Sequence, residues 1–216
     1  MVTGKFTKTA VIIFVLVALL LESSLAQINA ITESGDEVLL YEDGKWAYKD
    51  HDVVSESEIS TNDEIFLKDE KSTFLVKSNK VNVGVWINPK LWRFEKGDGD
   101  NEYLFTLKNE DLYAMFITER IAIPLDILKT AALSNAKDAA SNVKIVKEEY
   151  RNVNESKVLM IQLSGTIQGI EFIYYGYYFS NEGGTVQLIT YTSKNLFDDY
   201  LGDMDNLLNG FVELNE

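Results

Sequence analysis

Residues 170–179, Ile-Glu-Phe-Ile-Tyr-Tyr-Gly-Tyr-Tyr-Phe, decide the fold of this chain. Side chains of a strand point alternately to its two faces, and here both sets are apolar or aromatic. One face carries Ile170, Phe172, Tyr174 and Tyr178, and the other carries Ile173, Tyr175, Tyr177 and Phe179. A strand that is apolar on both faces is covered on both sides. We therefore predict a central strand in a sheet sealed by a helix layer on either side, with little interior room for reaction chemistry.

Other predicted strands and two predicted helices surround this segment. Strand patterns occupy residues 73–77, 81–87, 91–94, 103–108, 112–118, 143–150, 158–167 and 186–192. Pro124 opens a helix that continues to Ser141, and its alanine-rich face should let it lie close against the sheet. A second helix begins at Asn195 as its N-cap and carries an apolar stripe as far as Phe211. The predicted fold is α+β, an α/β/α sandwich around an antiparallel sheet.

Three short segments in this order resemble a known group of proteins. They are Val83-Gly-Val-Trp-Ile-Asn-Pro-Lys-Leu-Trp92, Gly184-Thr-Val-Gln-Leu-Ile-Thr-Tyr191 and Leu207-Leu-Asn-Gly-Phe211. Together with the helix between them, they resemble the PsbP-like and DcrB-like fold group over roughly residues 72–214. The resemblance implies a non-enzymatic binding or assembly module, usually outside the cytoplasm in bacteria. No catalytic residue is carried over, because the group has no shared one, and fold likeness alone does not define a function.

The N-terminal segment has the pattern of a secretory signal peptide. A basic start with Lys5 and Lys8 precedes twelve apolar residues, 10–21, which are too few to span a bilayer as a helix. Ser24 and Ala26 then fit the −3 and −1 positions of a cleavage site, and Ala30 offers a second one. We predict a signal peptide at residues 1–26 and a periplasmic or extracellular product with no stable membrane insertion after cleavage. An uncleaved membrane anchor is the alternative.

Between the signal peptide and the main domain, the sequence predicts two further segments. Residues 31–49 contain Asp43-Gly44 between two short apolar stretches, which is typical of a β-hairpin. Residues 50–65 are rich in Asp, Glu, Ser and Thr without Lys or Arg, so we expect an extended acidic linker. The main domain is predicted to occupy residues 66–216.

Composition excludes several classes of function. The chain has 20 basic and 34 acidic residues, a net charge of −14, which disfavours binding to a nucleic-acid backbone. It has no cysteine, so disulfides and thiolate catalysis are excluded. His51, the single histidine, lies in the acidic linker, where a solvated side chain explains it. The sequence indicates no cofactor, no metal ligand set and no catalytic residue.

Candidate ligand-binding residues come from two places in the sequence. Tyr175, Tyr177 and Tyr178 could stack on a ligand, although packing in a two-sided core explains the same rings. Gly176 would let a ligand approach the backbone of that strand. The carboxylates are Glu171 on the tyrosine strand and Glu119 beside Arg120, and two acids in one cleft would permit carboxylate chemistry.

These observations favour an exported, non-enzymatic binding or assembly module, whose partner is a protein or a small ligand of the bacterial envelope. One alternative is a carboxylate-type hydrolase. The other is a calcium-dependent surface protein, since Asp98-Gly-Asp-Asn-Glu102 places oxygen donors close together. That loop has no bidentate Glu at its twelfth position, and an ordinary acidic turn explains it equally.

Overall fold

The computed structural model describes residues 28–31, 37–40, 46–48 and 59–214, and the chain divides into two compact units between residues 57 and 58. The first unit contains β1 (Ile28–Ile31), β2 (Glu37–Leu40) and β3 (Trp46–Tyr48) in an antiparallel sheet of that order. Two strands were predicted here, and β1 was missed because residues 28–30 were assigned to the cleavage region. The predicted signal peptide, the Asp43-Gly44 turn and linker residues 50–58 lie outside the described residues.

Eight strands form the large sheet of the second unit, in the order β4-β10-β11-β12-β13-β9-β8-β7. Their bounds are β4 (Thr61–Phe66), β7 (Trp92–Lys96), β8 (Asn101–Leu107), β9 (Tyr113–Glu119), β10 (Lys144–Val153), β11 (Ser156–Ile167), β12 (Ile170–Asn181) and β13 (Gly184–Ser193). The tyrosine-rich segment is β12, in the interior of the sheet as predicted. Neighbours pair in antiparallel fashion throughout, except that β4 runs parallel to β10. The expectation of a wholly antiparallel sheet is therefore wrong at this edge.

β4 also corrects the predicted linker, because residues 61–65 belong to a strand. The Tyr150 amide donates to the Ser60 carbonyl at 2.8 Å, which fixes the start of this parallel pairing. Polar and acidic side chains hid the strand from a search for apolar alternation. An edge strand tolerates such side chains, since one of its sides faces solvent and charges there discourage pairing with other chains.

A smaller antiparallel sheet and two helices complete the unit. The small sheet has the order β14-β6-β5, with β5 (Phe74–Lys77), β6 (Val83–Ile87) and β14 (Phe211–Glu213). The helices are α2 (Leu125–Ala139) and α3 (Phe197–Leu208), and α3 follows a 3₁₀ turn, η1 (Lys194–Leu196). Asn195 lies inside that turn and is not an N-cap, and Phe211 begins a strand and does not end the helix. Both corrections shorten the predicted second helix.

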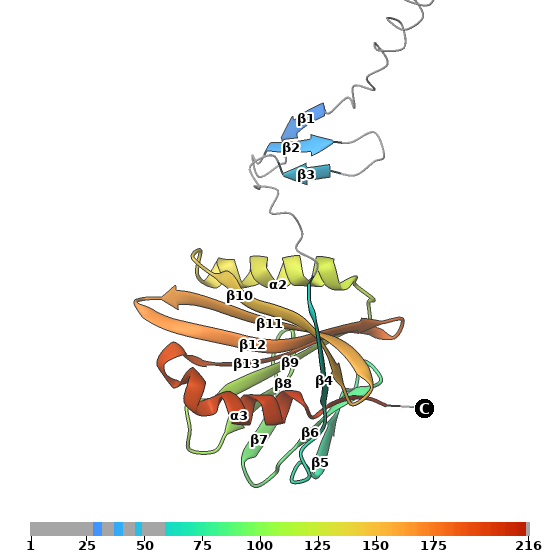
Figure 1. Ribbon diagram of the computed structural model, residues 1–216, viewed down its shortest axis with the longest axis vertical. Helices are drawn as coiled ribbons and strands as arrows, with labels where there is room; N and C mark the ends of the chain where they lie inside the picture. Colours follow the sequence, from blue (N-terminus) through green and yellow to red (C-terminus); the bar gives the residue numbers. More distant parts are fainter. Residues whose placement is uncertain (1–27, 32–36, 41–45, 49–58, 215–216) are drawn as a thin grey trace, which may run out of the picture. The chain divides into compact units, whose positions relative to one another are not determined.

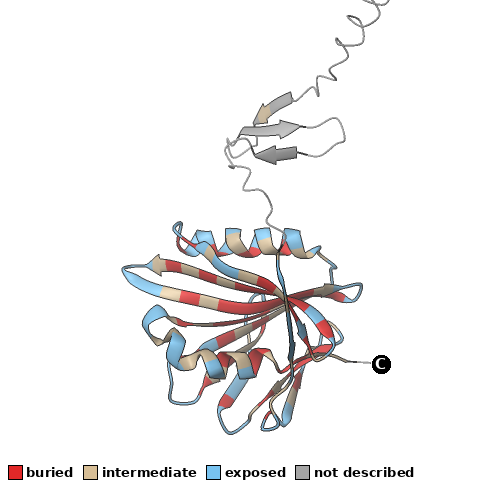
Figure 2. Ribbon diagram, viewed as in Figure 1, coloured by how far each residue is buried: buried red, intermediate tan, exposed pale blue. Residues whose placement is uncertain are grey.

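The two faces of β12 contribute to two separate apolar clusters, as its sequence predicted. Tyr175, Tyr177 and Phe179 pack in the cluster that contains α3, whereas Tyr178 packs in the cluster that contains α2. Figure 1 shows the two helices on opposite sides of the large sheet, and Figure 2 shows buried residues along its middle strands. The α3 side is covered by a helix together with the small sheet, so that layer is not made of helix alone. Ile170, at the strand end, is exposed.

Gly176 serves the sheet itself. A Cβ atom at this position would lie 2.7 Å from the Leu188 carbonyl oxygen and 2.9 Å from the Ile189 Cα atom. The close neighbour of this glycine is therefore the backbone of β13, and not a ligand as the sequence had suggested. In the described part of the chain, no helix combines the length and apolar character needed to cross a membrane.

Candidate functional site

A hollow of about 280 Å³ lies between α2 and the face of the large sheet that β9, β11, β12 and β13 form. Met115, Leu163 and Ile189 line it from the sheet, and Ala132 and Ala136 line it from the helix. Asn135 and Ala139, farther round the helix, also line the hollow and are exposed, so it opens to solvent along α2. This opening was not expected, because the tyrosine strand was predicted to leave little interior room.

The alanine face of α2 explains why space remains there. The helix packs on the sheet through Leu128, which is 2% exposed, and through Ala132 and Ala136. Large side chains such as Leu128 and Tyr178 set the distance between the layers. The methyl groups of the alanines are too short to fill that distance, so the small side chains produce a hollow where tight packing was expected.

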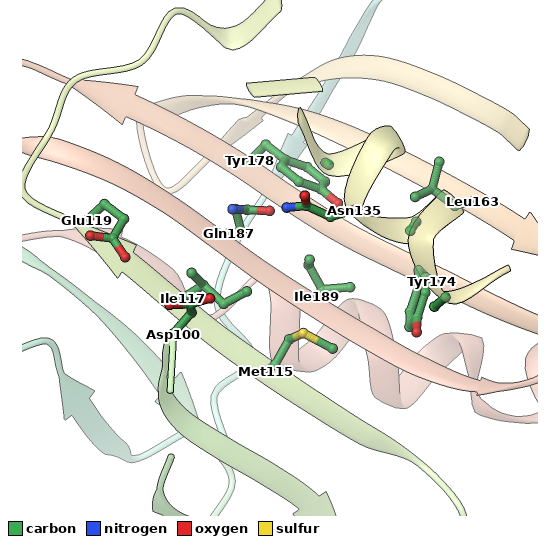
Figure 3. Close-up of a pocket in the computed structure, with 13 residues that line it drawn as sticks. Asp100, Met115, Ile117, Glu119, Asn135, Leu163, Tyr174, Tyr178, Gln187 and Ile189 are labelled. Atoms are coloured by element: carbon green, nitrogen blue, oxygen red, sulfur yellow. The ribbon is translucent and has the colours of Figure 1, made fainter. Parts of the chain in front are cut away.

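Polar groups occupy one end and the middle of the hollow. Figure 3 shows Glu119 and Asp100 at one end, with the Gln187 and Asn135 amides toward the centre. Tyr178 lies beside these amides and is 1% exposed. Burial raises the pKa of Tyr178, and the neighbouring Tyr174 adds to the rise. The Tyr178 hydroxyl therefore stays protonated at neutral pH and can serve as a hydrogen-bond donor.

Of the predicted ligand-binding residues, the structure brings only Tyr178 and Glu119 to the hollow. Arg120 instead donates from Nε to the Lys80 carbonyl at 3.2 Å and from Nη2 to the Asn79 carbonyl at 3.4 Å. Glu171 lies on an exposed part of β12 and pairs with Lys194 at 2.9 Å. These two side chains are each held by other groups outside the hollow.

Tyr175 and Tyr177 lie on the opposite face of the sheet, in a buried hydrogen-bond network centred on Arg151. The Arg151 guanidinium donates to both hydroxyls, at 2.7 and 3.1 Å, and to Glu149 Oε1 at 2.7 Å. The Tyr175 hydroxyl donates onward to Asp205 Oδ1 of α3 at 2.7 Å. The network joins β10, β12 and α3, so these tyrosines hold the fold together and their hydroxyls are not available to a ligand.

Two residues of β4, the edge strand next to β10, complete the network. The Arg151 guanidinium carbon lies over the Phe66 ring of β4, 4.5 Å from the ring centroid. The Asn62 side-chain amide, also on β4, donates to the Glu149 carboxylate at 3.3 Å. Arg151 was missed by the sequence analysis. One signal existed: Glu149, Arg151 and Val153 alternate along one strand, so the two charges share a face with a buried valine.

The electrostatics of this network follow from burial and from its contacts. Burial acts to raise the pKa of Glu149, but hydrogen bonds from Arg151, Lys147 and Asn62 outweigh it and lower the pKa. Burial raises the pKa of Tyr177 to about 12, against the opposing effect of the Arg151 charge. At neutral pH the network therefore contains an ionised carboxylate, a charged guanidinium and neutral phenols.

Glu102, in the loop considered for calcium, has a different partner set. Its carboxylate accepts hydrogen bonds from the Ser78 hydroxyl at 2.6 Å, from the Asn79 amide at 2.5 Å, and from Thr118. Both carboxylate oxygens are thus engaged within the protein. Among the described residues, no group of three or more His, Cys, Asp or Glu side chains could hold a metal ion. His51 lies outside those residues.

The Glu102 contacts predict how stability responds to pH. Burial acts to raise the pKa of Glu102, but hydrogen bonds from Asn79, Ser78 and Thr118 outweigh it and lower the pKa below its usual 4.5. The resulting stabilisation is present above the unfolded-state pKa and is lost as the pH falls through the lower folded-state value. We expect Glu102→Gln to cost about 1–3 kcal/mol at pH 7, and to flatten the acid-side loss of stability.

Urea denaturation at neutral and acidic pH measures both effects. Asp98→Asn is the matched control, because Asp98 is exposed in the same loop and should change stability by less than about 0.5 kcal/mol. Equal effects of the two substitutions at pH 7 would contradict a structural role for the buried carboxylate.

No family model and no curated protein matches the sequence. Solved structures do match it. The cyanobacterial PsbP protein CyanoP from Synechocystis sp. PCC 6803 has a TM-score of 0.50 and 13% identity, over 65% of this chain and 91% of that chain. PA94 from Pseudomonas aeruginosa, a putative regulator of unknown function, has a TM-score of 0.43 and 9% identity, over 66% and 98% of the two chains. LpqN, which is involved in cell envelope biogenesis of Mycobacterium tuberculosis, has a TM-score of 0.43 and 12% identity, over 63% and 86%.

At these identities the likeness shows the fold alone. The main unit has the PsbP-like fold, and the resemblance stated from three sequence segments is confirmed at that level. A shared fold supports many unrelated functions, so the site has to be argued from its own residues.

Proposed function

We propose that this chain is an exported, non-enzymatic binding protein of the bacterial envelope, and that it holds a small, largely apolar molecule in the hollow between α2 and the large sheet. The observation that carries the proposal is the hollow itself. Its volume of about 280 Å³ is close to the lower end of ligand pockets, about 300–1,000 Å³, and its apolar walls with a few polar groups are typical of them. A molecule with up to three rings would fit this space.

The acidic groups at one end restrict the charge of the ligand. Glu119 and Asp100 line the hollow, and the whole chain has a net charge of −14. Carboxylate or phosphate groups would be repelled there, whereas neutral or cationic groups would not. The Asn135 and Gln187 amides and the Tyr178 hydroxyl can hydrogen-bond a neutral polar group. The proposed ligand is therefore a neutral or cationic molecule with an apolar body.

A binding role is favoured over carboxylate hydrolysis by the surroundings of Glu119. Its carboxylate lies 4.0 Å from the Lys80 ammonium group and is about half exposed. Hydrolysis of this type needs two acids with separated pKa values around a reacting bond. Arg120 and Glu171, the other predicted members of such a site, lie elsewhere. Asp100, the second acid at this end of the hollow, is exposed to solvent.

Export is proposed from the N-terminal sequence pattern. N-terminal sequencing of the chain recovered from a bacterial host tests it, with cleavage after Ala26 as the expected result. Retention of residues 1–26 would favour the anchored alternative.

Fluorescent probes can test the hollow directly. N-phenyl-1-naphthylamine is neutral, and 8-anilino-1-naphthalenesulfonate has nearly the same rings with an added negative charge. We expect the neutral probe to gain fluorescence with the protein and to bind at least about tenfold more tightly than the anionic probe. Failure of both probes to bind would contradict an apolar site, and preference for the sulfonate would contradict the proposed role of Glu119 and Asp100.

Two phenylalanine substitutions on α2 locate the bound probe. Ala136 lines the hollow, whereas Ala131 is exposed on the same helix and lies outside it. We expect Ala136→Phe to fill the space and weaken probe binding at least about tenfold, and Ala131→Phe to leave it unchanged. Circular dichroism confirms that both variants are folded. Equal probe affinity in the two variants would place the probe elsewhere and contradict the proposed site.

A further inference from the structure

The outer edge of β7 is an unpaired strand edge with mostly exposed side chains in the described residues. β7 ends the large sheet, and its outer edge pairs with no other strand in the described residues. Four of its five residues, Arg93, Phe94, Glu95 and Lys96, are exposed. Exposed strand edges present unpaired backbone groups and act as templates for pairing with another chain.

The hydrogen-bond pattern with β8 identifies the free backbone groups. The Leu91 carbonyl accepts from the Lys108 amide at 2.9 Å, and the Gly97 amide donates to the Glu102 carbonyl at 3.0 Å. In an antiparallel pair such bonded residues alternate, so residues 93 and 95 also bond inward. The amides and carbonyls of Phe94 and Lys96 therefore point outward. The Trp92 amide is occupied by the Asn88 carbonyl at 2.9 Å, which leaves its carbonyl free.

We propose that β7 pairs in antiparallel fashion with β7 of a second copy of this chain, centred on Phe94, so that the two large sheets become continuous. In this register the two Phe94 residues exchange both backbone hydrogen bonds. Each Lys96 amide then faces the free Trp92 carbonyl of the second copy. Every outward-pointing amide of β7 thereby gains an acceptor.

The side chains favour the same register. Around a centre at Phe94, Arg93 of one copy lies opposite Glu95 of the other, and this happens twice by symmetry. These are non-hydrogen-bonded positions of the new pair, where opposing side chains are closest. In the described residues, neither side chain has an ion-pair partner within its own chain. Self-complementary charges on an edge strand specify pairing with an identical strand.

Apolar contacts add to the proposed interface. Phe94 is 38% exposed, and its ring lies 5.6 Å from that of Phe74, which is 46% exposed. A shallow hollow of about 270 Å³ beside these rings is lined by Ile87, Pro89 and Trp92. Two copies would bring both Phe94 rings together over this surface.

The local charge around β7 allows two copies to meet there, whereas the charge on β4 opposes self-pairing at the other edge of the sheet. From Lys90 to Lys108 the chain has four basic and four acidic residues, so this region is neutral in a chain of net charge −14. The opposite edge of the sheet behaves differently. β4 carries Asp63 and Glu64 without a basic residue, so self-pairing there would oppose like charges. The structure therefore favours one edge over the other.

Sedimentation velocity of the mature chain tests the proposal. Concentrations should reach about 1 mM, because an interface formed mainly by one edge strand is small and small interfaces are weak. We expect a monomer–dimer equilibrium in the wild type. Arg93→Glu or Glu95→Arg should weaken dimerisation at least about tenfold, since each creates two like-charge contacts. The double variant with both changes should restore dimerisation. Lys137→Glu, on the exposed side of α2, alters the net charge as Arg93→Glu does and should have no effect.

The register can be tested separately, because the chain has no cysteine. In the proposed dimer residue 93 lies directly opposite residue 95, at a separation that suits a disulfide, whereas two residues 93 are too far apart. We expect oxidised dimers when the Arg93→Cys and Glu95→Cys chains are mixed, and few when either is oxidised alone. A wild type that stays monomeric throughout, or a charge-swapped double variant that fails to dimerise, would overturn the proposal.

Discussion

Replacing Arg151 with alanine is expected to lower the free energy of unfolding by about 3–5 kcal/mol. Arg151 is 6% exposed, and it donates to Glu149 Oε1 and to the Tyr175 hydroxyl, each at 2.7 Å. Alanine would leave a buried carboxylate and two phenol hydroxyls without their main donor, and an unpaired buried charge is far more costly than a lost surface pair. Urea denaturation at neutral pH measures the loss.

Lys147 provides the matched control, because it contacts the same carboxylate from the solvent side. Its ammonium group lies 3.1 Å from Glu149 Oε2, and its side chain is 52% exposed. Lys147→Ala should therefore cost less than about 1 kcal/mol. If the two alanine variants lost equal stability, the Arg151 network would be as well solvated as a surface ion pair, and its proposed structural role would be wrong.

The sequence predicted the centre of the fold well because β12 obeys a simple rule. Alternation along one strand assigned Tyr175, Tyr177 and Phe179 to one face and Tyr178 to the other, and burial in two clusters confirms the assignment. A strand buried on both faces has few alternatives, so its pattern is strong. The strands around it were found from the alternation of apolar and polar side chains along each of them.

The edges of the molecule were harder to predict, since edge strands depend on backbone pairing more than on side-chain pattern. The six residues of β4, Thr-Asn-Asp-Glu-Ile-Phe, resemble a linker in composition. β14 has only three residues, and the apolar stripe of α3 leads into it with little separation. Neither strand carries a pattern long enough to separate it from its neighbour.

The site could be predicted only in part. Rings of Tyr177 and Tyr178 are adjacent in sequence, yet one hydroxyl joins the Arg151 network and the other lies by the hollow. Both side chains are buried, and which of the two lies beside open space depends on what covers each face. On one face a buried network fixes α3 to the sheet, and on the other the alanines of α2 leave space. That difference arises from tertiary packing and is invisible in the local pattern.

The last prediction concerns Gly210, the glycine in the Leu-x-Gly-Phe segment that supported the resemblance. A Cβ atom at Gly210 would lie 2.0 Å from the Trp86 carbonyl oxygen, which is backbone and has no rotamer to adopt. The Gly210 carbonyl also accepts from the Trp86 amide at 2.8 Å, so the two segments cannot separate without losing this bond. We expect Gly210→Ala to lower the free energy of unfolding by about 3 kcal/mol, measured by urea denaturation.

Gly202→Ala is the matched control for Gly210→Ala. It lies within α3, and a Cβ atom there would meet nothing within 4 Å. The same change, Gly202→Ala, should raise stability by about 0.5–1 kcal/mol, because alanine loses less backbone freedom than glycine in a helix. Opposite signs for the two substitutions would tie the effect at Gly210 to the close approach of β6. A mild effect at Gly210 would instead mean that α3 and β14 can move away from β6, and that the small sheet is not held as tightly as its backbone contacts require.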